Sequence, residues 1–130
     1  MTTNEHEARW AQAELDHERL DVYRTAVAID AQVVALRRRA ARGHAWLHDQ
    51  AERASGSMVL NLAEALARKG ADRAQRLRIA RGSALETDAA VQLLAHRGIV
   101  ANEGRAQTRT LVVRVVAMLT RLQTVAERGV

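Results

Sequence analysis

Apolar residues recur along much of the chain at alternating steps of four and three, the spacing of one face of an α-helix. Residues 18–42 carry such a row, which consists of Val22, Ala26, Ile29, Val33, Leu36 and Ala40. Residues 102–127 carry a main row of Leu111, Val115, Met118, Leu122 and Val125, with a parallel row of Val112, Val116 and Leu119. Residues 72–97 carry Leu77, Ala80, Ala84, Val91 and Ala95, with Asp88 interrupting the row. Rows of this kind are the buried faces of bundle helices.

Three glycines separate these helical segments, and each follows a basic stretch: Gly43, Gly70 and Gly98. Basic residues favour the negative end of a helix, and glycine readily adopts the left-handed conformation that ends one. Short connections between long helices make neighbours antiparallel. We therefore predict an all-α, antiparallel up-and-down four-helix bundle in residues 18–130. Its helices are expected in residues 18–42, 45–69, 72–97 and 102–127.

Composition supports a helical fold and narrows the chemistry. The 130 residues contain no proline, phenylalanine or cysteine, one tyrosine and two tryptophans. Strand-rich folds favour aromatic residues and need turn formers between strands. The lack of cysteine excludes disulfides, thiolate nucleophiles and cysteine zinc sites. No apolar run approaches the roughly 18 residues of a membrane span and no signal peptide is visible, so we expect a cytoplasmic protein without a membrane partner.

Charge is distributed unevenly along the chain. Residues 1–30 carry seven acidic and three basic residues, whereas the other hundred carry 17 basic and eight acidic residues. The net charges are therefore −4 and +9, and a basic body of this kind favours polyanions or acidic protein surfaces. Residues 1–17 form an N-terminal extension that either continues the first helix or frays.

The basic residues gather in two groups. One ends the first predicted helix and contains Arg37, Arg38, Arg39 and Arg42; the other surrounds the second turn and contains Arg68, Lys69, Arg73, Arg76, Arg78 and Arg81. An antiparallel bundle places these groups at opposite poles. We interpret them as contacts to the phosphate backbone of RNA or DNA. The alternative is a solvated arginine-rich face. Few aromatic residues are available for base stacking, which argues against sequence-specific recognition of single strands.

Polar residues also recur at helical spacing in the middle of the chain. Ser57, Asn61, Glu64 and Arg68 share one helix face, and Gly82, Ser83 and Glu86 lie at the centre of the next helix. One hypothesis is a structural hydrogen-bonded network of Ser57, Asn61, Glu64, Ser83 and Glu86 that sets helix register, with Gly82 permitting close helix approach. A solvated face is the alternative.

These segments resemble the four-helix-bundle proteins encoded in intervening sequences of bacterial 23S rRNA genes. The matching pieces are Leu20-Asp-Val-Tyr23-Arg-Thr-Ala26, Ser57 with Asn61-Leu-Ala-Glu64, Arg68, and Ala80-Arg-Gly82-Ser83-Ala-Leu85-Glu86. The chain departs from the family pattern at Ala65, where glycine is usual, and at Val59-Leu60, where proline is common. The family fold is similar to the accessory protein of diversity-generating retroelements, which works with a reverse transcriptase and binds nucleic acid. The resemblance implies a bundle that assembles into a ring-like pentamer.

Surplus apolar positions also favour self-association. Leu20, Tyr23, Val27 and Val34 lie beside the main row of the first helix, which is more apolar surface than one bundle needs. The alternative is a monomer in which this helix is broadly buried.

Enzyme interpretations find little support in the sequence. Di-metal bundles use Glu-x-x-His twice, and Glu14 with His17 is a single copy. His44, His48 and Glu52 share a helical spacing that is more typical of surface histidines than of a metal site. We expect no catalytic residue, cofactor or metal. The sequence therefore predicts a non-catalytic homo-oligomer that binds nucleic-acid backbone, or a protein that handles nucleic acid. The alternative is a purely structural or scaffolding oligomer without nucleic-acid affinity.

Overall fold

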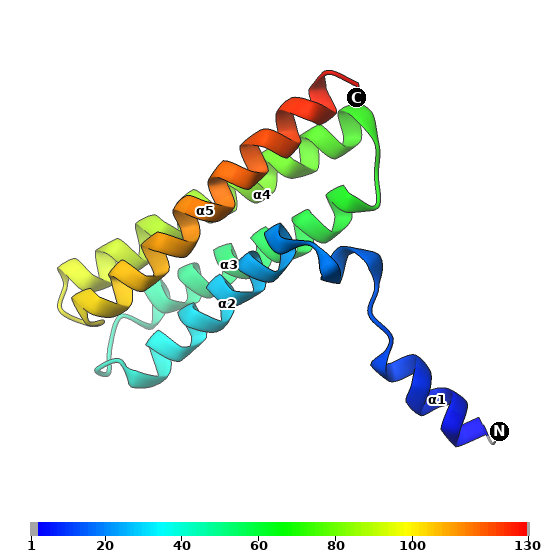
Figure 1. The fold of residues 1–130 in the computed structure, drawn as a ribbon. Helices are drawn as coiled ribbons and strands as arrows, with labels where there is room; N and C mark the ends of the chain where they lie inside the picture. Colours follow the sequence, from blue (N-terminus) through cyan, green and yellow to red (C-terminus); the bar gives the residue numbers. More distant parts are fainter. Residues whose placement is uncertain (1–2, 130) are drawn as a thin grey trace.

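The computed structural model describes residues 3–129 and consists of helices joined by short connections (Figure 1). Four long helices form the body of the molecule, and no strand occurs in the described part of the chain. They are α2 (Asp21–Arg39), α3 (Ala45–Leu66), α4 (Gly70–His96) and α5 (Asn102–Glu127). The predicted all-α class and four-helix bundle are confirmed.

Each long helix packs against two others, in the cyclic order α2, α3, α4, α5 and back to α2. Successive helices run in opposite directions, so the chain goes up and down around a central core. Two ends result. At one end lie the connections between α2 and α3 and between α4 and α5, and at the other lie the α3–α4 connection and the C-terminus (Figure 1). We refer to these ends as the arginine pole and the C-terminal pole.

The predicted core face of α2 is buried as expected, from Val22 through Ile29 to Leu36. In α5 the predicted main row is only partly buried. Its member Val115 is fully buried, and Leu111, Met118 and Leu122 pack against the core, whereas Val125 is 47% exposed. Val112 and Leu119 of the parallel row complete the centre of the buried face. Apolar side chains occupy two adjacent rows of this helix, so the pattern alone does not decide which row faces the core.

Small residues line the contact between α3 and α4. Buried alanines alternate there with larger side chains such as Met58 and Leu77, which allows the two helix backbones to pack closely. Thr87 takes the core position next to Asp88, and its hydroxyl donates to the Ser83 carbonyl at 2.8 Å. A buried hydroxyl is thereby satisfied within its own helix.

All three turn glycines have a positive φ, +112° at Gly43, +56° at Gly70 and +71° at Gly98, and Gly70 is also the first residue of α4. Gly82 has a different role from the predicted one. A β-carbon there would meet no atom within 4 Å, so Gly82 is not a close helix contact. The close approach occurs instead at Gly104, on α5.

The N-terminal segment contains a short helix, α1 (Thr3–Gln12), and a 3₁₀ turn, η1 (Asp16–Arg19). Figure 1 shows α1 standing away from the bundle. The η1 turn contacts the start of α2, where the rings of His17 and Tyr23 form a T-shaped pair with 4.8 Å between ring centroids. Among residues 3–129, no helix is long and apolar enough to cross a membrane.

Candidate nucleic-acid interface

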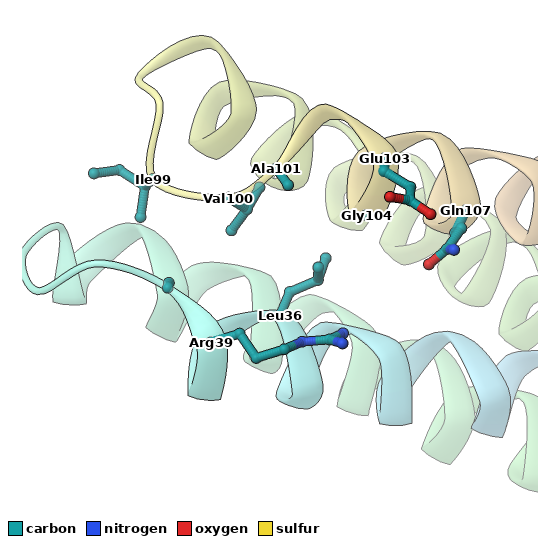
Figure 2. A pocket seen from close by; sticks show the side chains of 9 residues that line it. Leu36, Arg39, Ile99, Val100, Ala101, Glu103, Gly104 and Gln107 are labelled. Atoms are coloured by element: carbon teal, nitrogen blue, oxygen red, sulfur yellow. The ribbon is translucent and has the colours of Figure 1, made fainter.

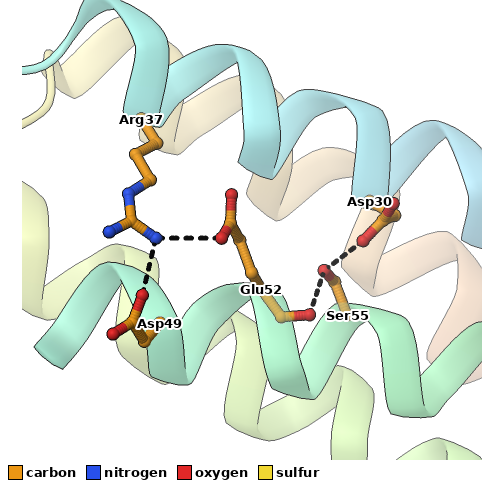
Figure 3. Close-up of polar contacts among 5 residues, drawn as sticks. All are labelled: Asp30, Arg37, Asp49, Glu52 and Ser55. Atoms are coloured by element: carbon orange, nitrogen blue, oxygen red, sulfur yellow. Dashed lines mark hydrogen bonds and ion pairs between the residues drawn. The ribbon is translucent and has the colours of Figure 1, made fainter. Parts of the chain in front are cut away.

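Arg37 ties α2 to α3, and its charge is already paired within the protein. One Nη atom of its guanidinium donates to Asp49 Oδ1 at 2.8 Å and to Glu52 Oε2 at 2.9 Å (Figure 3). Hydrogen bonding from these two carboxylates, with Asp49 the stronger contributor, raises the pKa of Arg37 above its ordinary value. The same helix pair is joined further along by the Ser55 hydroxyl, which donates to Asp30 Oδ1 at 2.6 Å. Arg37 therefore has a structural role.

The other three arginines of this group remain free. Arg38, Arg39 and Arg42 are exposed, and within residues 3–129 none of them has an ion-pair or hydrogen-bond partner. They occupy the last turn of α2 and the connection that follows it, where the helix carbonyls favour positive charge. Figure 2 shows Arg39 at the edge of a pocket of about 260 Å³ between α2 and the start of α5. Three guanidiniums without an ion-pair partner among the described residues thus face solvent at one end of the bundle.

Two residues that sequence reasoning did not select complete this pole. Trp46, in the first turn of α3, is 60% exposed. The Arg97 guanidinium, at the end of α4, lies 5.4 Å from the centroid of the Trp46 ring, within the range of a cation–π contact. The place of Trp46 in the sequence could have indicated its exposure. Trp46 directly precedes the buried Leu47, so the two side chains point to different faces of the helix. The low aromatic content of the chain obscured this signal.

The second predicted group is largely engaged within the protein. Arg73 closes the C-terminal end of α3, since its Nε donates to the Arg68 carbonyl at 2.7 Å and its Nη2 to the Leu66 carbonyl at 3.2 Å. Arg68 pairs with Glu64 at 2.9 Å. Arg78 contacts Glu127 at 3.1 Å and Gln75 at 2.6 Å, and Arg81 donates to Thr120 at 3.1 Å. Lys69 is exposed and has no ion-pair partner among the described residues. This group therefore presents much less free positive charge than the sequence suggests.

Three of the five residues predicted to form a polar network are joined. The amide of Asn61 donates to Ser57 Oγ at 3.1 Å, and Ser83 Oγ donates to Ser57 Oγ at 3.0 Å across the α3–α4 contact. Arg76 extends the network by donating to Asn61 Oδ1 at 3.3 Å.

The remaining two predicted members lie outside this network. Glu64 is half-exposed and accepts from Arg68, a hydrogen bond that lowers the pKa of its carboxyl. Glu86 accepts from Gln50 at 2.7 Å. The network is therefore smaller than predicted, and an arginine belongs to it.

The histidines do not assemble with acidic residues. Within residues 3–129, no group of three or more histidine, aspartate or glutamate side chains is placed to hold a metal ion. His48 is buried, and desolvation, reinforced by the charge of Arg37, lowers the pKa of its imidazole. His44 has a left-handed backbone with φ +57° at the start of α3.

The chemistry that the arginine pole offers to a ligand is exposed positive charge beside an indole.

Comparisons with known proteins agree with the architecture. Residues 18–121 match the model of the family described as 23S rRNA-intervening sequence protein. A crystal structure of a protein of unknown function from the S23 ribosomal protein family of Bacteroides thetaiotaomicron is similar, with a TM-score of 0.69 and 19% identity. The match covers 78% of this chain and 97% of that one, and at this identity it concerns the fold alone. No curated protein matches the chain.

Proposed function

Because the chain belongs to the 23S rRNA-intervening sequence protein family, we propose that it is a non-catalytic, self-associating helical bundle that binds the phosphate backbone of nucleic acid. The binding surface is the arginine pole, formed by Arg38, Arg39, Arg42 and Arg97. A cytoplasmic location is part of the proposal, because that is where such a ligand would be met.

The observation that carries this proposal is that one arginine group is largely paired within the protein, whereas most of the other group is not. At the C-terminal pole Arg68, Arg73 and Arg78 are bound by carboxylates and carbonyls of the protein itself. At the arginine pole three guanidiniums have no such partner among the described residues. Guanidinium groups pair well with phosphate oxygens, and each phosphate that a protein neutralises releases a counterion. Free, clustered arginines are therefore better suited to a polyanion than arginines already engaged.

Self-association is supported by a separate surface. Val27 on α2 and Leu60 on α3 are 42% and 69% exposed, and with Gly56 and Val59 they line a shallow pocket between the two helices. Apolar side chains in this number are expected at a contact with another protein. A ring of such protomers, such as a pentamer, would repeat the arginine pole in each copy, and several weak phosphate contacts would add up.

Fluorescence anisotropy with labelled structured RNA and duplex DNA tests the proposal. Binding is expected at ~50 mM salt, weakening as salt rises with a log–log slope of about −3 for a protomer that contacts three or four phosphates of a duplex. Light scattering on the same samples gives the assembly state. An oligomer that does not bind nucleic acid at low salt would favour the scaffolding alternative. The shallow pocket at Leu60 is also compatible with that alternative. Affinity that is independent of salt would contradict the electrostatic mechanism.

A further inference from the structure

The arginine pole carries an aromatic side chain whose exposure has no structural explanation. Trp46 is 60% exposed, although tryptophan is a side chain that proteins usually bury to a large extent. The residue is not needed for the core, because the adjacent Leu47 fills that position. The other aromatic side chain that the structure describes, Tyr23, is half-buried against the core. Trp46 is therefore the aromatic surface that the described side chains offer to a ligand.

Its surroundings are cationic. The guanidinium of Arg97 lies over the indole, 5.4 Å from the ring centroid, which is within the range of a cation–π contact. Arg42 precedes Trp46 by four residues across the turn at Gly43 and His44, so the free charges that end α2 and the indole that begins α3 lie at the same end of the bundle. A ligand whose phosphates contact these arginines brings its bases to the same end.

We infer that Trp46 is a stacking platform for an unpaired base, so that the arginine pole binds a single-stranded, looped or bulged nucleic acid more tightly than a continuous duplex. The inference rests on the proposed nucleic-acid function of this pole. In a duplex the bases are stacked on each other, and an indole adds little to backbone contacts. An unpaired base presents a π-face, and stacking on an aromatic side chain is tolerant of sequence. One indole reads no sequence, so a preference for unpaired structure without a preference for particular bases is expected.

The test compares three ligands with the same number of phosphates: a mixed-sequence single strand, the same strand with abasic sites, and a duplex. Binding is measured by anisotropy at ~50 mM salt for the wild type, Trp46→Ala and Trp46→Phe, each as RNA and as DNA. The Trp46→Ala variant is expected to bind the single strand about 5- to 100-fold more weakly, with duplex and abasic affinities unchanged. Trp46→Phe retains an aromatic face and should recover part of the loss.

Intrinsic fluorescence provides an independent readout. The chain has two tryptophans, and Trp10→Phe leaves Trp46 as the only one. Adding the single strand to this variant should quench its emission, whereas the abasic strand should not. Equal affinity of Trp46→Ala and wild type for the single strand, or equal losses of affinity for single strand and duplex, would overturn the stacking role. Either result would leave the proposed function intact. If no ligand binds at low salt, the proposed function fails together with the stacking role. Thermal melts of both Trp46 variants verify that the bundle is intact, as expected for an exposed position.

Discussion

A β-carbon on Gly104 would overlap Cδ2 of Leu36, so the Leu36 side chain of α2 packs directly on the backbone of α5. Gly104 lies in the first turn of α5 and Leu36 near the end of α2, and both residues are buried. The glycine therefore has a packing function, although glycine is a poor helix former. The contact lies beside the pocket at Arg39 (Figure 2), and it helps to fix how the two helices meet at the arginine pole.

Replacing Gly104 by alanine is expected to destabilise the bundle. Overpacking a core contact costs about 1–3 kcal/mol. Better helix propensity returns somewhat less than about 1 kcal/mol. A net loss of about 1 kcal/mol in the free energy of unfolding should appear in urea titrations.

Gly82→Ala is the matched control for this change. It lies within α4, and its β-carbon would meet nothing within 4 Å, so alanine should stabilise the protein by about 0.5–1 kcal/mol. In a Leu36→Ala background, Gly104→Ala should become neutral or stabilising because the overlapping methyl is gone. A Gly104→Ala variant as stable as Gly82→Ala would show that the Leu36 contact carries no strain.

The polar network predicts a difference between two neighbouring positions of α3. Asn61→Ala removes the shared partner of Ser57 and Arg76 and should cost about 1–2 kcal/mol. Glu64→Ala removes an exposed pair with Arg68, for which a change within about 0.5 kcal/mol is expected. Thermal melts of both variants measure the contrast. Equal losses would mean that Glu64 contributes to the core contact after all.

The buried imidazole of His48 predicts a loss of stability in mild acid. Desolvation lowers its pKa in the folded state, so below about pH 6.5 the unfolded chain binds a proton that the folded protein does not. Stability contributed by the neutral form is therefore complete above that pH and declines as the pH falls through the folded-state pKa. Urea unfolding between pH 5 and pH 7 should show this slope, and His48→Gln should reduce it. An unchanged slope in the variant would assign the effect to other groups.

Leu60 predicts where protomers meet. A charge at this 69% exposed position should leave the fold intact but weaken assembly, so Leu60→Glu is expected to reduce the particle mass in light scattering. Val113→Glu is the control, because Val113 is similarly exposed on α5, which is not a direct neighbour of α3 in the bundle. If Val113→Glu dissociated the oligomer and Leu60→Glu did not, the interface would lie on the α5 side of the bundle and not at Leu60.

The helical class, the number of long helices and most of the α2 core were predictable because they depend on residue spacing within one segment. Tertiary register was not. Gly82 and Gly104 are both helical glycines, and only the packing of α5 on α2 shows which one permits close approach. In α5 two apolar rows compete for the core, and the position of Val115 and Leu119 against the other helices decides between them.

The candidate site was predictable in part for the same reason. The sequence locates the arginines at the two poles but does not show which have partners. Arg37 and Arg78 are neutralised by Glu52 and Glu127, residues 15 and 49 positions away along the chain. Trp46 is recognised as part of the candidate site only through its contact with Arg97, which joins α3 to the end of α4. Each of these relationships is a product of helix packing.

The central claim is that nucleic acid binds at the arginine pole. It is tested most directly by comparing two variants that each lose three positive charges, one at each pole. One variant combines Arg38→Ala, Arg39→Ala and Arg42→Ala. The other removes three exposed charges near the C-terminal pole, where Arg121 lies near the end of α5 and Arg128 directly follows it. It combines Lys69→Ala, Arg121→Ala and Arg128→Ala, and therefore has the same net charge as the first. Anisotropy titrations at ~50 mM salt should show about a tenfold or greater loss of affinity for the first variant, with a shallower salt dependence, and little change for the second. Equal losses in both variants would mean that net charge alone governs binding, and the arginine pole would then not be the site.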